Sequence, residues 1–259
     1  MPELPDLQVF SRNLTRLLAN KKIRKVNIIR AKKIKTPASK LRAGLEGAKV
    51  KKVERSGKEL HFFLSNKNVL AIHLMLRGEL HFFEGTHAEK FGIIELIFAD
   101  NSGLVVSDYQ GQATPTLNPP AHDGVDALSE KMNSKFLAKI LASSKASVKN
   151  LLLDQHVIRG IGNAYVDEIL WDARISPFSI ANKIPEASVK ALAKSIRKVL
   201  RQAEKNILKS NPDIISGEVR DFLKIHNSKK EKSPLGAPIL IHQGGGRKTY
   251  YTEEQELYK

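Results

Sequence analysis

Hydrophobic positions recur at helical spacing near the start of the chain. They predict one apolar face of a helix over residues 4–19, formed by Leu7, Phe10, Leu14, Leu17 and Leu18. Pro5 is compatible with this helix because proline is tolerated in a first turn. From residue 23 to about residue 106 the pattern changes to short apolar runs separated by turn residues. The runs are Val26–Ile29, Leu60–Leu64, Val69–Leu74, Glu79–Phe83, Ile93–Phe98 and Leu104–Val106.

These runs predict an antiparallel β-sandwich or barrel, and helical periodicity returns after a segment rich in Pro, Asn and Gly. We expect a helix capped by Ser134, a second over about 148–154, a third after a break at Arg159–Asn163, and a long one opening at Pro185. The tail predicts a hairpin of Ile239–His242 and Lys248–Thr252 around three glycines. The fold class is therefore α+β. The expected domains are a helix and β-sandwich (1–112), a linker (113–128), a helical domain (129–226) and a finger hairpin (227–259).

The charge balance predicts a polyanionic partner. The 259 residues include 43 Lys and Arg against 27 acids, which gives a net charge of +16 and a pI near 9.9. Nucleic acid or an acidic membrane surface fits this balance. No apolar run approaches the ~18 residues of a membrane span, and no secretory h-region follows Met1, so we expect a soluble, intracellular chain. Of the two polyanions, nucleic acid is the partner that we expect, and no membrane partner is expected. The lysine-rich stretches at 32–52 and 224–232 are most simply solvated faces.

The absence of cysteine limits the chemistry further. It excludes disulfides and thiolate zinc sites, and the eight histidines show no tight metal-ligand spacing. We therefore expect no metal and no cofactor. The expected location is the cytoplasm, in association with the nucleoid, for a bacterial chain, and the cell interior otherwise.

The Met1-Pro2 start offers a nucleophile if Met1 is removed. An α-amino group titrates near 7.7–8.0, so a useful fraction is unprotonated in the cell. The iminium ion that a secondary amine forms at a sugar C1′ cannot lose a proton to become neutral, and so it acts as an electron sink for elimination. Taken alone, Met-Pro is an ordinary start.

Three further places could bind phosphate. Gly160-Ile161-Gly162-Asn163 can place a helix N-terminus and an amide beside a phosphate, although a structural corner between helices gives the same pattern. Lys58 follows Ser56-Gly57 at a predicted hairpin, where it is either a cation beside a phosphate or a solvated lysine. Arg247 follows three glycines at a loop tip, as either a bidentate phosphate donor or a surface arginine.

Several motifs then occur together, in one order, along nearly the whole chain. They are Pro2-Glu3-Leu4-Pro5, Ser56-Gly57-Lys58, His73-Leu74, Gly124-Val125-Asp126-Ala127-Leu128-Ser129, and Leu153-Asp154-Gln155 through Gly160-Ile161-Gly162-Asn163-Ala164-Tyr165. This set resembles the formamidopyrimidine-DNA glycosylase/endonuclease VIII family, whose members share such a start, a lysine hairpin and a helix–two-turn–helix. Asp6 stands where that family usually has a glutamate.

The resemblance implies a base-excision DNA repair enzyme, a bifunctional DNA glycosylase and AP lyase that flips out the damaged nucleotide. The Pro2 amine would attack C1′ to form a Schiff base, and elimination would cut the strand. Glu3 and Lys58 would complete the catalytic set. His73, Asn163 and Arg247 would bind phosphates and Leu76 would act as the wedge. The implied partner is damaged double-stranded DNA, with single-stranded DNA as a further substrate, for a monomeric enzyme.

The chain departs from the family in three places. Lys232, Leu235, Thr252 and Gln255 stand where a four-cysteine zinc finger is common, so the resemblance is to the zincless members, with apolar packing by Leu235, Ile239 and Ile241 expected under the hairpin. Asp108-Tyr109-Gln110-Gly111-Gln112 lacks the arginine and phenylalanine of the family's gap-filling loop, and Tyr109, Gln110 or Gln112 could replace them. Asn211–Val219 is short where 8-oxoguanine-specific relatives have a longer capping loop.

These departures leave an alternative on the same scaffold, a catalytically weak or silent protein that binds damaged or abasic DNA. The presence of Pro2, Glu3 and Lys58 favours the enzyme. A basic RNA-binding protein is the third reading, but it gives the Met-Pro-Glu-Leu-Pro start no role.

Overall fold

The computed structural model describes residues 1–30, 34 and 36–259. The chain forms two compact units, one of residues 1–121 and 207–218 and the other of residues 122–206 and 219–259. No helix in the described part of the chain is both long and apolar enough to cross a membrane. Lys32, Lys33 and Lys35 of the first lysine-rich stretch lie outside the described residues.

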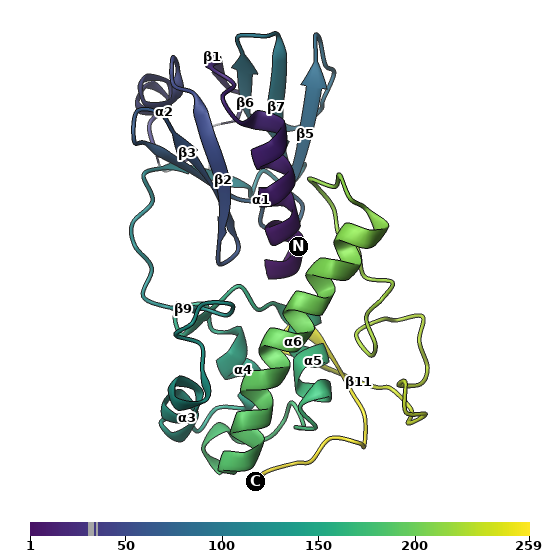
Figure 1. Ribbon diagram of the computed structural model, residues 1–259. Helices are drawn as coiled ribbons and strands as arrows, with labels where there is room; N and C mark the ends of the chain where they lie inside the picture. Colours follow the sequence, from purple (N-terminus) through teal and green to yellow (C-terminus); the bar gives the residue numbers. More distant parts are fainter. Residues whose placement is uncertain (31–33, 35) are drawn as a thin grey trace. The chain divides into compact units, whose positions relative to one another are not determined.

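The first unit is a β-sandwich that carries the N-terminal helix (Figure 1). Its described strands form two antiparallel four-stranded sheets, ordered β1-β6-β7-β5 and β2-β3-β4-β8. The α+β class is confirmed, and the β-region is a sandwich rather than a closed barrel. The elements are α1 (Leu4–Leu18), β1 (Ile23–Ile28), α2 (Ala38–Leu45), β2 (Val50–Ser56), β3 (Glu59–Leu64), β4 (Val69–His73), β5 (Glu79–Glu84), β6 (Gly92–Phe98), β7 (Ser102–Ser107) and β8 (Thr114–Leu117).

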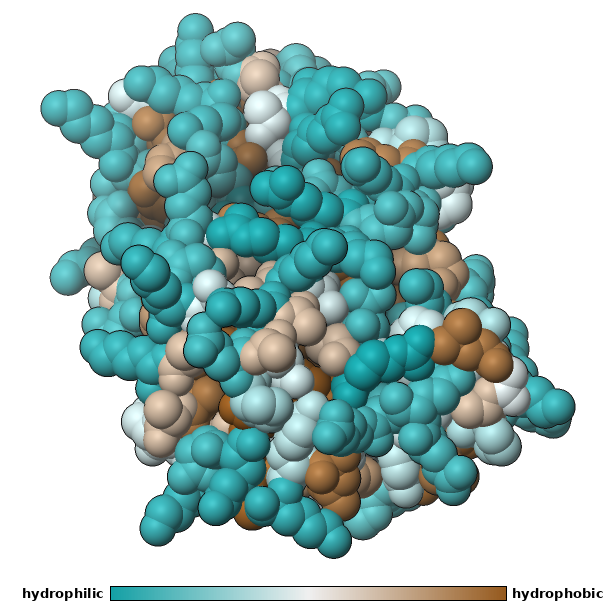
Figure 2. All heavy atoms as spheres, turned by 60° about the horizontal axis from the view of Figure 1, so that its bottom comes forward, coloured by the Kyte–Doolittle hydropathy of each residue, from teal (hydrophilic) through white to brown (hydrophobic). Residues whose placement is uncertain are grey.

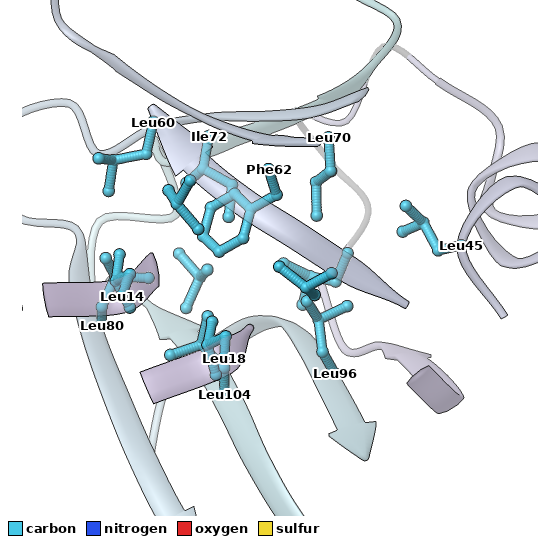
Figure 3. Packing of buried hydrophobic residues seen from close by; sticks show 14 of the residues in the cluster. Leu14, Leu18, Leu45, Leu60, Phe62, Leu70, Ile72, Leu80, Leu96 and Leu104 are labelled. Carbon is cyan, nitrogen blue, oxygen red and sulfur yellow. The ribbon is translucent and has the colours of Figure 1, made fainter. Parts of the chain in front are cut away.

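The core of this unit lies between the two sheets and α1. Figure 3 shows side chains from β3 and β4, from β5, β6 and β7, and from α1 pointing into one common interior. Phe10 and Leu14 of α1 and Phe62 of β3 are almost completely buried there. A hydrogen-bond pair also fixes α1 to the sheet, because Thr15 Oγ1 both donates to Val53 O and accepts from Val53 N, at 2.9 and 2.8 Å.

Three elements of this unit were not expected from the sequence. Strand β2 has its buried residues three positions apart, at Val50 and Val53, because a bulge between Val50 and Lys52 interrupts the alternation of faces. Helix α2 is short and follows Pro37. Strand β8 lies within the segment expected to be a linker. It pairs with β4 at the edge of its sheet, where Pro115 is tolerated.

The second unit is mainly helical. Its α5 opens at Asn163, the last residue of the expected break, and α6 opens at Glu186, next to the expected Pro185. Ser134 was expected to cap α3, but the cap is Asn133, whose side chain accepts from Phe136 N at 3.0 Å. The elements are β9 (Val125–Asp126), α3 (Ser134–Ala142), α4 (Val148–Leu153), β10 (Ile158–Arg159), α5 (Asn163–Asp172), the 3₁₀ helix η1 (Ala181–Lys183), α6 (Glu186–Ser210, whose last residues belong to the first unit), β11 (Leu240–Gly244) and β12 (Arg247–Tyr251).

Residues 207–218 return the chain to the first unit. Ile214 and Ile215 pack against the sandwich core, and Asn13 Nδ2 of α1 donates to Ile214 O at 2.8 Å. Ser216 Oγ accepts from Leu80 N of β5 at 2.9 Å. We call residues 211–218 the return segment. Apolar contacts and hydrogen bonds therefore hold it against α1 and β5.

Candidate active site

The first helix starts at the residues expected to react. Glu3 is the N-cap of α1, and it forms a reciprocal capping box with Asp6, whose Oδ2 accepts from Glu3 N at 2.8 Å. Pro2 and Glu3 are both buried, and Glu3 is only 4% exposed. Asp6 at the position where a glutamate is usual in the family therefore has a local role in capping α1. The arrangement fixes the backbone of Pro2 and Glu3 at the helix N-terminus.

Lys58 lies in the tight turn between β2 and β3. Gly57, with φ of +60°, takes the first central position, and the pair Ser56 and Glu59 closes the turn. Arg55 ties this turn to α1, because its Nε donates to Gln8 Oε1 at 2.9 Å and its Nη1 donates to Gly57 O at 3.2 Å. Figure 1 shows the N-terminus of α1 and the tip of this hairpin at the same end of the first unit.

His73 ends β4 and pairs across the sheet with Glu59. Burial lowers the pKa of His73; Glu59 opposes that effect and Lys58 adds to it. The imidazole is therefore neutral near pH 7. Its Nδ1 accepts from Met75 N at 3.0 Å, which places the ring proton on Nε2. His73 can thus offer one N–H to a phosphate oxygen without carrying charge.

The turn after β4 presents Leu76 to solvent. Its side chain is 59% exposed, whereas Leu74 is buried. Gly78 N donates to Leu74 O at 2.8 Å, and a Cβ on Gly78 would lie 2.3 Å from that oxygen, so only glycine fits there. This tight turn holds an apolar side chain outward, as a wedge requires.

The loop that departs from the family pattern is well ordered by Asp108. This carboxylate is 1% exposed and accepts from Gln110 N at 2.9 Å, Gln112 N at 2.7 Å and Ala113 N at 2.8 Å. Tyr109 at the tip is 57% exposed, and its hydroxyl accepts from Gln110 Nε2 at 3.2 Å. Tyr109, Gln110 and Gln112 are the residues that could replace the arginine and phenylalanine of the family's gap-filling loop. Of these three, Tyr109 offers an exposed aromatic ring.

Glu218 is a residue of this site that sequence reasoning missed. It lies in the return segment, and its carboxylate forms an ion pair with the N-terminal ammonium of Met1. The two partners are 217 positions apart. A single acid in an irregular stretch has no periodicity or motif that would have revealed this contact.

In the second unit, the turns before α5 are built around Gln155. Its Nε2 donates to Leu153 O and Ile161 O, both at 2.9 Å, and its Oε1 accepts from Gly160 N at 3.0 Å. Gly124 is required beside this turn, because a Cβ there would lie 2.5 Å from Gln155 O. The glycine of the Gly-Val-Asp-Ala-Leu motif therefore lets β9 run parallel to β10 at close range.

Asn163 and Arg247 come together through the finger hairpin, which is β11 and β12. Asn163 Nδ2 donates to Lys248 O at 2.9 Å, next to the exposed Arg247 at the hairpin tip. The Oδ1 atom of Asn163 is enclosed and accepts no hydrogen bond from any residue that the structure describes. The tip is a two-residue turn of Gly245 and Gly246, both with positive φ.

A buried ionic network holds the hairpin on α4 and α5. Lys149 Nζ donates to Asp167 Oδ1 at 2.7 Å and to Thr249 Oγ1 at 2.8 Å. Asp167 Oδ2 accepts from Tyr250 N at 3.0 Å and lies 2.7 Å from His226 Nδ1. Because both ions are nearly inaccessible, removal of either one would deprive the other of its closest opposite charge inside the protein.

The apolar packing expected under the finger hairpin is partly wrong. Leu235 and Ile241 are 61% and 53% exposed. The buried cluster is instead Trp171 of α5, Ile225 and Tyr250, with Ile239 packed against it. Ile241 pairs with Tyr250 across the hairpin, but it is the tyrosine ring that packs with Trp171 and Ile225. Ile239 is the one expected residue that takes part.

Polar side chains link the base of the finger where zinc ligands are common in the family. Glu254 accepts from Trp171 Nε1 at 2.7 Å, from Thr252 Oγ1 at 3.0 Å and from Ser233 Oγ at 2.8 Å. Gln255 is also buried here, and it accepts from Thr252 N at 2.8 Å and donates to Ile175 O at 2.8 Å. Lys232, Leu235, Thr252 and Gln255 do not fit a zinc ion, and the described residues contain no group of three or more potential metal ligands.

The structure thus places the seven predicted site residues in two groups. Pro2, Glu3, Lys58, His73 and Leu76 belong to the first unit, and Asn163 and Arg247 belong to the second. Hydrophilic side chains cover most of the face in Figure 2, as expected for a chain with 27% charged residues.

Comparison with known proteins covers both units. Residues 1–114 match the formamidopyrimidine-DNA glycosylase N-terminal domain, and residues 124–210 match its H2TH domain. The chain is similar over its full length, and theirs, to formamidopyrimidine-DNA glycosylases of Lactobacillus helveticus, at 33% identity, and Lactobacillus gasseri, at 30%. A solved structure of the Lactococcus lactis enzyme with abasic-site DNA is similar with a TM-score of 0.88 at 26% identity, over 98% of this chain and 100% of that one.

Similarity of this extent places the protein among the DNA glycosylases, enzymes that bind DNA and act in its base-excision repair. More narrowly, the chain belongs to the formamidopyrimidine-DNA glycosylase/endonuclease VIII family.

Proposed function

We propose that the protein is a bifunctional DNA glycosylase and AP lyase, in which the Pro2 amine is the nucleophile after removal of Met1. The observation that carries this proposal is the buried Pro2-Glu3 pair at the capped start of α1, with the Lys58 turn tied to the same helix through Arg55 and Gln8. An amine held at a rigid helix start can be aimed at one sugar carbon.

The proposed chemistry runs in three steps. The Pro2 nitrogen forms a bond to C1′ as the bond from C1′ to the base breaks, and the base leaves with the electron pair. The nitrogen then loses its remaining hydrogen as a proton, and its lone pair forms the C1′=N bond while Glu3 gives a proton to the ring oxygen and the C1′–O4′ bond opens, which leaves the iminium ion of a Schiff base. Loss of a C2′ proton expels the 3′ phosphate and cuts the strand.

Phosphate contacts complete the proposal. Lys58 supplies a cation near the amine, His73 a neutral N–H, and Arg247 a bidentate fork. Asn163 contributes its side-chain amide, which would have to exchange the Lys248 carbonyl for a phosphate. Leu76 fills the gap left by the flipped nucleotide. We expect a monomer that acts on double-stranded DNA and retains some activity on single strands.

Abasic sites, oxidised pyrimidines and ring-opened purines are the substrates we propose, ahead of 8-oxoguanine. The return segment is short and lies on α1 and β5, so little chain is left to cap a flipped base. Selection then depends on how easily a nucleotide leaves the stack. The Lactococcus lactis relative has been solved with abasic, Fapy-dG and oxidised-pyrimidine DNA. Preference for 8-oxoguanine opposite cytosine would contradict this proposal.

Borohydride trapping tests the reaction directly. The mature protein, starting at Pro2, should form a covalent adduct with abasic DNA, and Pro2→Gly should reduce it to near background. Glu3→Gln should slow base excision by roughly 10²–10⁴-fold, and slow lyase action on a preformed abasic site less. Undiminished trapping by a protein that retains Met1 would exclude Pro2 as the nucleophile.

One alternative is a silent binder of damaged or abasic DNA, favoured by the exchanged loop at Tyr109 and the Leu76 wedge. Tight binding of abasic DNA without a trapped adduct would identify it.

A further inference from the structure

The ion pair of Glu218 with the N-terminal ammonium of Met1 places a second carboxylate one residue away from Pro2, the proposed nucleophile. Glu3 is the first, and its carboxylate accepts from the backbone N–H of Asp6 in the capping box. Glu218 is tied instead to the free end of the chain. Its side chain is 37% exposed, so a bound substrate and solvent can both reach it.

The position of Glu218 is fixed by its neighbours in the return segment. Ile214 and Ile215 pack on the sandwich core, and the hydrogen bonds from Asn13 to Ile214 O and from Leu80 N to Ser216 Oγ hold the chain just before Glu218. Gly217, with φ of +88°, then turns the chain immediately before Glu218. The packing of the return segment therefore positions the Glu218 carboxylate at the N-terminus of the chain.

Removal of Met1 moves the ammonium by three covalent bonds, to the Pro2 nitrogen, which is within about 4 Å of the old position. A glutamate side chain can follow a displacement of that size by changing rotamer. We propose that in the mature enzyme Glu218 pairs with the Pro2 nitrogen and accepts the proton that this nitrogen must release during Schiff-base formation. The proposal rests on Pro2 being the nucleophile.

The proton balance shows why such an acceptor is needed. When the secondary amine bonds to C1′, its nitrogen carries one hydrogen and a positive charge. That hydrogen must leave before the nitrogen lone pair can form the C1′=N bond and open the sugar ring. Glu218 takes this proton while Glu3 gives one to the ring oxygen, so that two carboxylates perform opposite transfers in one sequence.

The test compares Glu218→Gln with Glu218→Asp, and Asp213→Asn serves as the matched control. Asp213 lies in the same segment and pairs with the exposed Arg16 of α1, outside the proposed chemistry. Two measurements are made across pH on proteins that start at Pro2. One is the single-turnover rate of borohydride trapping on abasic DNA. The other, without DNA, is the rate of reductive methylation of the N-terminal amine, followed by mass spectrometry.

We expect Glu218→Gln to slow trapping at its pH plateau by about 10²-fold, as for loss of a general base. The acid limb of the methylation profile should move to lower pH, because an uncharged amide no longer favours the ammonium form. Glu218→Asp should recover part of the rate, and Asp213→Asn should match the wild type. Glu3 and Lys58 are present in every variant, so the differences isolate Glu218.

Wild-type rates and profiles in Glu218→Gln would overturn the proposal. So would slow trapping with an unmoved methylation profile, because that pattern belongs to a purely structural contact. If the wild type itself gives no adduct, the proposed function fails. The methylation profile then tests by itself whether Glu218 pairs with the Pro2 nitrogen. A shift between the wild type and Glu218→Gln supports this pairing, and an unshifted profile refutes it.

Discussion

Glu254 accepts three hydrogen bonds at the base of the finger hairpin, and its removal should loosen the finger. Alanine at this position deprives Trp171, Thr252 and Ser233 of their acceptor. A hydrogen bond to a charged group contributes about 1.5–3 kcal/mol. Because 15% of the side chain is exposed, water can replace part of the loss. Three such bonds sum to about 4.5–9 kcal/mol, and with this replacement by water we expect a total below that sum, about 3–4 kcal/mol.

The chain offers a direct assay, because Trp171 is its single tryptophan and donates to this carboxylate. Thermal unfolding followed by tryptophan fluorescence should show Glu254→Ala melting roughly 10 °C below the wild type, at about 2–4 °C per kcal/mol. The exposed neighbour provides the control, and Glu253→Gln should leave the midpoint within about 1 °C. Equal shifts for the two variants would refute a specific role for Glu254.

Acid pH should remove the same stabilisation. Burial acts to raise the pKa of Glu254, but the hydrogen bonds from Trp171, Ser233 and Thr252, with the charge of Arg174, outweigh it and lower the pKa. A carboxyl whose pKa is lower in the folded state stabilises the fold fully above its unfolded value, near 4.3, and loses that contribution as pH falls through the folded value. The destabilisation by Glu254→Gln should therefore be largest near pH 7 and shrink below pH 4. A penalty independent of pH would contradict this reasoning.

The other predictions concern DNA binding, the turn before α5 and metal dependence. Arg247→Ala should weaken DNA binding for all sequences and reduce the slope of log affinity against log salt by about 1, and an unchanged slope would exclude a phosphate contact. Gly124→Ala should cost about 1–3 kcal/mol in thermal or urea unfolding, because its Cβ would meet Gln155 O at 2.5 Å, and a neutral effect would show that β9 can shift freely. Chelation should leave activity intact, because Lys232, Leu235, Thr252 and Gln255 do not suit zinc; loss on chelation with recovery on adding zinc would show the opposite.

The sequence predicted most of the sandwich and the helices because their apolar positions follow regular periods. It missed β2, where a bulge replaces alternation with a three-residue spacing, and β8, whose proline is acceptable only at a sheet edge. Both failures have one physical cause. An irregularity that tertiary packing allows cannot be read from the local pattern.

The residues of the candidate site divide in the same way, into those with a local sequence signal and those placed only by tertiary packing. Pro2, Lys58 and Asn163 stand at a helix start or in a glycine turn, where residue type and position carry information. Glu218 has no such signal, because only the packing of the return segment brings it to the N-terminus. The finger was misjudged for a related reason, since the number of apolar residues in a hairpin does not say which of them contact Trp171.

The return segment also makes the protein less modular than a linker between two domains suggests. The chain passes from one unit to the other three times, after residues 121, 206 and 218. A fragment that stops at residue 121 lacks Ile214 and Ile215, and so misses part of its own interior. A single proteolytic cut in the linker would leave the two units covalently joined. Grafting the first unit onto another helical domain would require two separate pieces of chain, residues 1–121 and 207–218, with Glu218 carried by the second.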